Sequence, residues 1–215
     1  MKRFFFVRAL AAGATLAACF GSNALAAPPA ETAFRDAWNG VKSFTATIQS
    51  HEVKGSATQD RTYHYAYLKP HFARIDIVDG PGKGGGAVWT GGDTIRGHRG
   101  GFLSGIQLNR PINDPEAVSL RGDNLLRASF QSVADDLKAA SNVAESAGTL
   151  DGQAVDILSA PLASADSSGV TKHVIYLSKA THLPVQRNTY AGDQLVKTEK
   201  WSNVNPNAGL KDSDF

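Results

Sequence analysis

The sequence of 215 residues contains a single cysteine, Cys19. It lies in an N-terminal segment with the parts of an export signal in order: the basic stretch MKRFFFVR (1–8), an apolar run over 9–20, and the small-x-small residues 24–26. This order predicts cleavage after residue 26, which leaves a chain without a thiol. Such a chain has no disulfide, no thiolate nucleophile and no cysteine metal site.

A second processing signal overlaps the first. Leu16-Ala17-Ala18-Cys19 has the pattern of a lipobox, in which the cysteine becomes the lipid-bearing first residue, and the two signals cannot both be used. We expect cleavage after Ala26, because Pro28-Pro29 forms a stiff exit and small residues are common enough here to match a lipobox by chance. The predicted organisation is a signal peptide over 1–26 and one periplasmic domain over 27–215. Anchorage through Cys19 is the alternative.

The sequence also lacks a charge excess and a long apolar run. Loss of the signal peptide removes three basic residues and leaves 19 basic against 20 acidic residues, a formal net charge of −1. Nucleic-acid binding is not expected without a basic surplus. No apolar stretch reaches the roughly 20 residues that a membrane-spanning helix needs.

Motifs for catalysis or cofactor binding are missing as well. GPGKGGG (80–86) matches G-x-G-x-x-G, but a strand and a turn follow where a dinucleotide site needs a helix, so a hairpin loop is expected. In GFLSG (101–105), Ser104 is one position away from a nucleophile elbow. The six histidines have no metal-ligand spacing, and Asp135-Asp136 is expected on a solvated helix face. We therefore expect no cofactor, no metal and no enzymatic activity, with a hydrolase built from distant loops as the less favoured alternative.

Alternation of apolar and polar residues dominates the rest of the chain. It places the three tyrosines of RTYHYAYL (61–68) on one face, where they belong either to the core or to a ligand-site wall. Helical spacing predicts helices over 31–42 and 127–140 instead. Short turns such as Asp151-Gly152 favour antiparallel pairing in one large curved sheet with a few helices against one side. The predicted strands are 43–50, 61–68, 72–78, 86–90, 94–99, 105–108, 142–150, 154–160, 172–178, 184–190 and 195–204.

Four stretches carry a family resemblance over nearly all of 31–215. They are the first helix followed by SFTATIQ, then YLKPHFARIDI, then GGAVWTGGDTIRGHRGG, and the late LDGQAVDIL…IYLSKATHLPVQRNTYAGDQLVKTEKW…NAGLKDSDF. In this order they resemble the LolA/LolB-like family of outer-membrane lipoprotein-sorting proteins. The resemblance implies an α+β fold, an incomplete (half-open) antiparallel β-barrel with helices covering a concave apolar face.

The resemblance also implies a function. It describes a periplasmic carrier that takes the acyl chains of a lipoprotein or another amphiphile into an apolar cavity, with inner-membrane donor or outer-membrane acceptor proteins as possible partners. Burial of about 15 methylenes contributes on the order of 10 kcal/mol before ordering costs, so such a carrier needs no catalytic group. The alternatives are an envelope sensor that binds a partner protein and a lipid-anchored lipoprotein acceptor.

Two sets of site residues follow from these patterns. The family's carriers have an arginine before the proline that separates two strands, and that arginine helps to hold the lid shut. Lys69 stands at this position, before Pro70, and Arg74 lies five residues further on. We expect Lys69 or Arg74 to gate the cavity by bonding helix-end carbonyls or a lid loop, the alternative being an exposed cation that contributes little. The predicted cavity residues are large apolar side chains at alternating strand positions: Phe44, Ile48, Ile75, Trp89 and Trp201.

Overall fold

A computed structural model describes residues 26–101 and 105–215. Cys19, Ser104 and both processing signals up to residue 25 lie outside the described residues. None of the described helices is long and apolar enough to cross a bilayer. The strands are β1 (Ser43–Lys54), β2 (Ala57–Leu68), β3 (Phe72–Asp79), β4 (Gly86–Trp89), β5 (Thr94–His98), β6 (Gln107–Pro111), β7 (Ala144–Leu150), β8 (Gln153–Pro161), β9 (Lys172–Ser178), β10 (Pro184–Ala191) and β11 (Gln194–Pro206).

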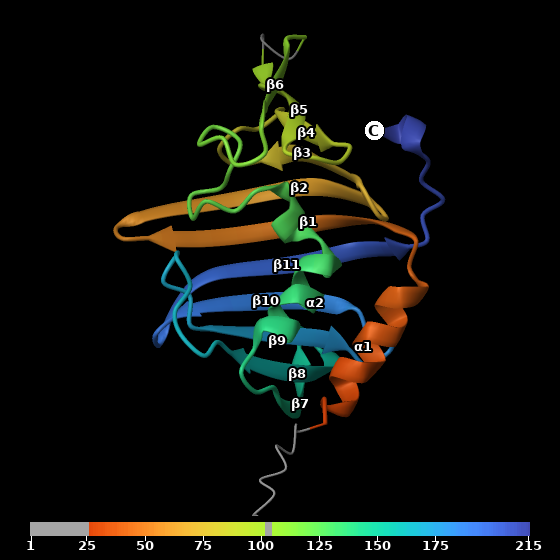
Figure 1. The fold of residues 1–215 in the computed structure, drawn as a ribbon, viewed down its shortest axis with the longest axis vertical. Coiled ribbons are helices and arrows are strands. Elements are labelled where there is room, and N and C mark those ends of the chain that lie inside the picture. Colours follow the sequence, from red (N-terminus) through yellow and green to blue (C-terminus); the bar gives the residue numbers. More distant parts are fainter. Residues whose placement is uncertain (1–25, 102–104) are drawn as a thin grey trace, which may run out of the picture.

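All eleven strands form one antiparallel sheet (Figure 1). The order is β6-β5-β4-β3-β2-β1-β11-β10-β9-β8-β7, so the last strand returns to pair with the first and joins the two halves. Strands β6 and β7 are the two edges and do not pair with each other, which leaves the barrel open. The predicted antiparallel sheet and its half-open form are therefore confirmed. The turn between β7 and β8 is a tight hairpin. Its two central residues, Asp151 (φ 48°) and Gly152 (φ 81°), adopt the left-handed backbone that such a turn requires.

Helix α1 (Pro29–Gly40) lies beside the sheet and is close to the predicted helix over 31–42. Proline at the first helical position fits the start, because that position has no intrahelical partner for its N–H. Phe34 and Trp38, one turn apart, are both buried against the sheet. The helix ends at Gly40, and Val41 continues as extended chain.

The second predicted helix is divided in two. A 3₁₀ turn, η2 (Leu125–Ala128), precedes helix α2 (Phe130–Ala139), where one helix over 127–140 was expected. Ser129 separates them, because its backbone is extended and its Oγ accepts a hydrogen bond from Ser132 N at 3.2 Å, which caps α2. The apolar spacing alone did not show this cap.

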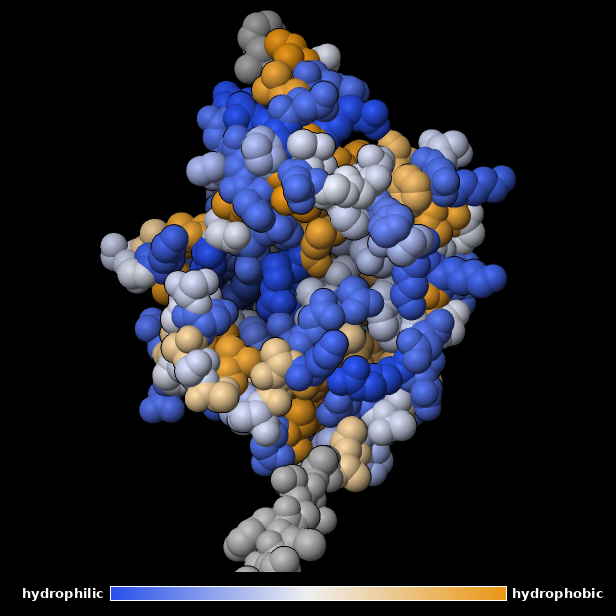
Figure 2. All heavy atoms as spheres, in the orientation of Figure 1, coloured by the Kyte–Doolittle hydropathy of each residue, from blue (hydrophilic) through white to orange (hydrophobic). Residues whose placement is uncertain are grey.

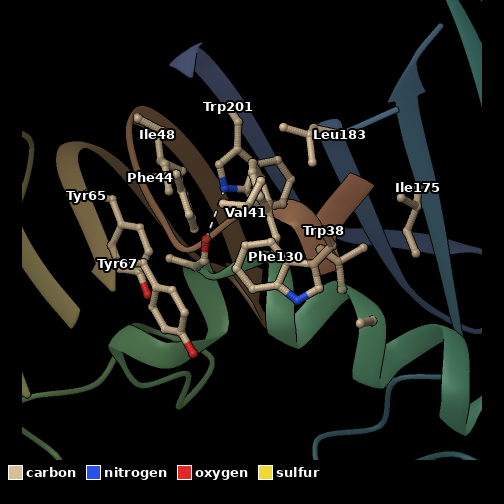
Figure 3. Close-up of a cluster of buried hydrophobic side chains, with 14 of the residues drawn as sticks. Trp38, Val41, Phe44, Ile48, Tyr65, Tyr67, Phe130, Ile175, Leu183 and Trp201 are labelled. Atoms are coloured by element: carbon tan, nitrogen blue, oxygen red, sulfur yellow. Dashed lines mark hydrogen bonds between the residues drawn. The ribbon is translucent and has the colours of Figure 1, made fainter. Parts of the chain in front are cut away.

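Residues 112–141, here called the crossing segment, connect β6 to β7 across the concave side of the sheet (Figure 1). Among their apolar side chains, Phe130 stacks on Phe44 of β1 with 4.3 Å between ring centroids and 7° between planes. Trp38 of α1 meets Phe130 edge-on at 5.8 Å, and Trp201 of β11 packs on the other side at 5.9 Å (Figure 3). The core therefore lies between the sheet, α1 and the crossing segment.

The concave face is apolar over only part of its length. Along β1, the inward positions change from Phe44 and Ile48 to Ser50 and Glu52, and the opposing part of β11 carries Lys197 and Glu199. These charged side chains are almost fully buried. The expectation of an apolar concave face is thus correct for the half near α1 and wrong for the other half, where ion pairs take the place of apolar packing.

Candidate functional site

The strand register places all five predicted cavity residues on the concave face. Phe44 pairs through Tyr67 and Ala73 with Trp89, and Ile48 pairs directly with Trp201. Residues directly opposite each other in neighbouring strands point to the same side of a sheet, so these side chains share one surface. Ile75 lies in the row between them, opposite Tyr65 and Ala87.

Their surroundings differ, however. Phe44, Ile48 and Trp201 are buried beneath the crossing segment, and the Trp201 indole N–H donates to Ala128 O at 3.0 Å. Trp89 is half-buried at the edge of this cluster, and its indole N–H donates to Gly92 O at 2.8 Å. Ile75 is the one residue of the five that lines an open cavity. Whether any of the five contacts a ligand stays a prediction.

The cavity has a volume of about 640 Å³. It lies between residues 116–128 of the crossing segment and the concave side of strands β1–β5 and β11. Figure 2 shows a hollow on this face with hydrophilic residues at its bottom. Its apolar wall includes Tyr63, Ile75, Ile77, Val118 and Leu125. Its charged wall includes Glu52, Arg61, Asp123, Arg127, Lys197 and Glu199.

Lys197 is the centre of the buried charges at the cavity floor. Its Nζ lies 2.6 Å from Asp123 Oδ2, 3.0 Å from Glu52 Oε1 and 3.1 Å from Glu199 Oε1. Burial alone lowers the pKa of an ammonium, but Glu199, Asp123 and Glu52 outweigh it and raise the pKa of Lys197 above its usual value. Burial likewise opposes ionisation of Asp123, yet Lys197 and Arg127 lower the pKa of this carboxyl to about 2.

Arg187, fully buried on β10, joins the sheet to the crossing segment. Its guanidinium pairs with Glu199 on β11 and, at 2.8 Å, with Asp136 on α2. It also donates to Ser132 Oγ at 3.0 Å and to Arg127 O at 2.6 Å. Three of its four partners therefore belong to the crossing segment, so this one side chain fastens α2 and η2 to the sheet.

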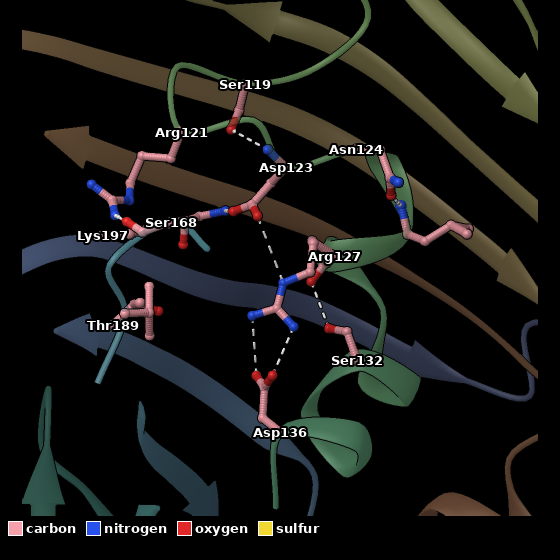
Figure 4. Close-up of polar contacts among 12 residues, drawn as sticks. Ser119, Arg121, Asp123, Asn124, Arg127, Ser132, Asp136, Ser168, Thr189 and Lys197 are labelled. Atoms are coloured by element: carbon pink, nitrogen blue, oxygen red, sulfur yellow. Dashed lines mark hydrogen bonds and ion pairs between the residues drawn. The ribbon is translucent and has the colours of Figure 1, made fainter. Parts of the chain in front are cut away.

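Arg127 and His173 complete the arrangement around Asp136. Arg127 donates to both carboxylate oxygens of Asp136, at 2.7 and 3.2 Å, and lies 3.8 Å from Asp123 (Figure 4). His173 Nε2 lies 3.6 Å from Asp136 Oδ1, and its Nδ1 contacts Thr189 Oγ1 at 3.1 Å. Burial lowers the pKa of His173 to about 4, although Asp136 favours the charged form. The imidazole is consequently neutral at pH 7.

The two predicted gate residues lie on different sides of the sheet. Lys69 Nζ donates to Trp38 O, in the last turn of α1, at 2.5 Å and lies 3.6 Å from the Trp38 ring centroid. Arg74 is exposed on the convex side, where it bonds Asp76 at 2.7 Å and Asp214 O at 3.3 Å. Lys69 thus makes the kind of helix-end contact that the sequence led us to expect, whereas Arg74 points away from the crossing segment.

Sequence reasoning missed the charged residues of this site. The signal for some of them was present, since Ser50 and Glu52 continue the inward alternation of Phe44 and Ile48. Lys197 and Glu199 likewise alternate with Trp201 along β11. Asp136 was expected on a solvated helix face but is buried, because Arg187 and Arg127 compensate its charge. The pair with Arg187 joins residues 51 positions apart and leaves no local signal.

The buried carboxylates of the site are all ion-paired. Each buried carboxylate around Lys197 and Arg187 has a cation within ion-pair distance. Among the described residues, no group of three or more histidine, cysteine or acidic side chains could hold a metal ion. The histidine in the buried network, His173, lies between Asp136 and the hydroxyl of Thr189.

Comparison with known proteins supports the fold. No family model matches the chain, and no curated protein is significantly similar to it. An uncharacterised conserved protein from Thermus thermophilus superposes with a TM-score of 0.53 at 12% identity, over 85% of this chain and 90% of that one. MucB superposes with a TM-score of 0.50 at 12% identity, over 86% of this chain and 60% of MucB. A LolA superfamily protein from Nitrosomonas europaea matches at 0.42 and 11% identity, over 88% and 98%.

Proposed function

We propose that this protein binds the acyl chains of a lipoprotein or another amphiphile on its concave face, beneath the crossing segment, and carries them through the periplasm. The main support for this proposal is that some residues belong both to the cavity wall and to the apolar core. Tyr63, Leu125 and Ala128 belong to both. Displacement of the crossing segment therefore enlarges the cavity directly into the aromatic surface around Phe44 and Trp201.

The crossing segment is suited to such a displacement. It contributes no strand to the sheet, so its movement breaks no strand pairing. It is held by stacking of Phe130 and by side-chain bonds such as those of Arg187 and of Trp201. Exposure of the apolar face costs free energy unless another apolar group covers it, and an acyl chain supplies that cover at ~0.8 kcal/mol per buried methylene.

Lys69 is the gate that we propose within this function. Its bond to Trp38 O fixes the end of α1, and Trp38 packs against Phe130 of the crossing segment. Loss of this bond in Lys69→Leu should loosen α1 and change the rate at which a bound fluorescent lipid is released, whereas Lys69→Arg should change it less. Equal release rates for the wild type and Lys69→Leu would place the gate elsewhere.

The proposed function is tested on protein purified from its own envelope by native mass spectrometry. A carrier should retain a lipid whose mass is lost on denaturation, and the delipidated protein should bind an environment-sensitive lipid probe. Protein that carries no lipid and binds no probe would contradict the proposal.

A second candidate is a sensor that binds a partner protein. The fold likeness to MucB favours it, since MucB has been crystallised in complex with MucA. In the native mass spectrum, a stoichiometric protein partner without a lipid would support the sensor. A lipid without a protein partner would support the carrier.

A further inference from the structure

Arg61 differs from the other cations that line the cavity. It lies on β2 opposite Ser50 of β1 and is half-buried. Its Nε donates to Pro81 O at 2.8 Å, which holds the guanidinium in place. Among the residues that the structure describes, no carboxylate lies within ion-pair distance of Arg61. Its guanidinium is therefore positioned by a neutral carbonyl, and Glu52 acts on its charge from beyond ion-pair distance.

The remaining cavity cations are all paired. Lys197 meets three carboxylates, Arg127 meets Asp136 at 2.7 Å, and Arg99 meets Glu116 at 2.7 Å. Lys83 lies 3.4 Å from Asp79. Burial lowers the pKa of Arg61, and Glu52, which opposes this effect, is itself in contact with Lys197. The cavity thus offers one cation that has no carboxylate within ion-pair distance in the described part of the chain.

The apolar wall sets the size of the molecule that fits. Ile75, Ile77, Val118 and Leu125 line the same cavity as Arg61. A methylene group is about the size of a water molecule, ~30 Å³, so a chain of 12 to 16 carbons fills roughly 360–480 Å³. A volume of about 640 Å³ holds one such chain and its head group, but not the several chains of a lipoprotein.

We propose that the cavity, with the crossing segment in place, takes one single-chain amphiphile whose anionic head, a carboxylate or a phosphate, is bonded by the Arg61 guanidinium. This inference rests on the proposed function and adds the charge and chain number of the ligand. The free guanidinium nitrogens match the paired oxygens of either head group, and both bonds form in a partly desolvated site. A neutral head leaves the charge of Arg61 unpaired, and a cationic head is repelled by it.

The test compares ligands that have the same chain and different heads. Laurate, dodecyl phosphate, dodecanol and dodecyltrimethylammonium are titrated at pH 8 against the delipidated protein, by displacement of a fluorescent lipid probe and below the concentrations at which they aggregate. The variant is Arg61→Gln, with Arg61→Lys as the charge-conserving partner. Lys200→Gln is the matched control, because it removes one positive charge from the convex side of β11. Circular dichroism checks the fold of each variant.

Wild-type protein should prefer the two anionic ligands to dodecanol by at least about tenfold, the value of one charge-assisted hydrogen bond in a partly buried site. Arg61→Gln should lose this preference and keep its affinity for dodecanol, Arg61→Lys should keep part of it, and Lys200→Gln should keep all of it. The wild-type preference should also fall with added salt. The ratio of laurate to dodecyl phosphate affinity identifies the better head.

Equal wild-type binding of anionic and neutral ligands would overturn this inference while leaving the proposed function standing. Binding of none of the four ligands, nor of the probe, would overturn both. Because the wild-type preference is itself a test, the inference stays open to refutation if Arg61→Gln does not fold.

Discussion

Replacement of Arg187 by methionine tests whether one buried ion-pair cluster fastens the crossing segment. Methionine keeps most of the side-chain length but removes the pairs with Glu199 and Asp136 and the bonds to Ser132 Oγ and Arg127 O. Loss of one partner from a buried pair costs about 3–5 kcal/mol. Glu199 and Asp136 each keep another cation, so we expect a loss near the lower limit, about 3 kcal/mol.

Urea unfolding followed by far-UV circular dichroism measures this loss, and hydrogen exchange locates it. Three of the four partners lie in the crossing segment, so amides of 125–139 should lose more protection than those of β1 and β11. Lys200→Met, which breaks an exposed pair with Asp151, is the control and should cost less than about 1 kcal/mol. A loss below about 1 kcal/mol in Arg187→Met, or equal deprotection of the whole sheet, would show that Arg187 does not fasten the crossing segment.

Three further predictions concern the cavity, the buried histidine and the N-terminus. Ile75→Asp should abolish lipid-probe binding in a folded variant, whereas Val88→Asp, on the convex side of the neighbouring strand, should not, and equal binding would remove Ile75 from the site. The pKa of His173 is about 4 in the folded protein and ~6.5 when unfolded, so the unfolded state takes up the proton first as the pH falls. The free energy of unfolding should therefore decline from about pH 6.5 to pH 4 by up to ~3 kcal/mol. In His173→Gln, the urea midpoint should depend less on pH over that range. The intact mass of the mature protein should correspond to a chain that begins at Ala27, while a chain that begins at Cys19 with added acyl mass would favour the lipid-anchored acceptor.

The strands were predictable because period-two alternation is a local signal. In β1, the sequence SFTATIQS shows it directly, and the register confirms that Phe44 and Ile48 share a face. Helix α2 was predicted from its apolar spacing, but its start was not, because the Ser129 cap depends on one hydroxyl. Turn signals such as Asp151-Gly152 gave the antiparallel pairing of neighbours.

The charged half of the concave face could not be predicted from local sequence patterns. The alternation of Lys197 and Glu199 with Trp201 predicts that all three point inward, yet a buried charge is credible only once its partner is known. Two of the three partners of Lys197, Glu52 on β1 and Asp123 in the crossing segment, lie 145 and 74 positions away in the chain, and the third, Glu199, is on β11 itself. Arg61 could not be predicted for the converse reason, because its role in our proposal depends on having no carboxylate within ion-pair distance among the described residues.

The proposed function requires that an acyl chain binds on the concave face beneath the crossing segment. A fatty acid with a photoreactive diazirine at its chain end, cross-linked to the delipidated protein and mapped by peptide mass spectrometry, tests it most directly. We predict cross-links on the cavity-lining parts of β2 and β3 and on residues 117–128, all reduced by excess unlabelled fatty acid. Cross-links confined to the convex side of the sheet, or unaffected by competition, would contradict the claim.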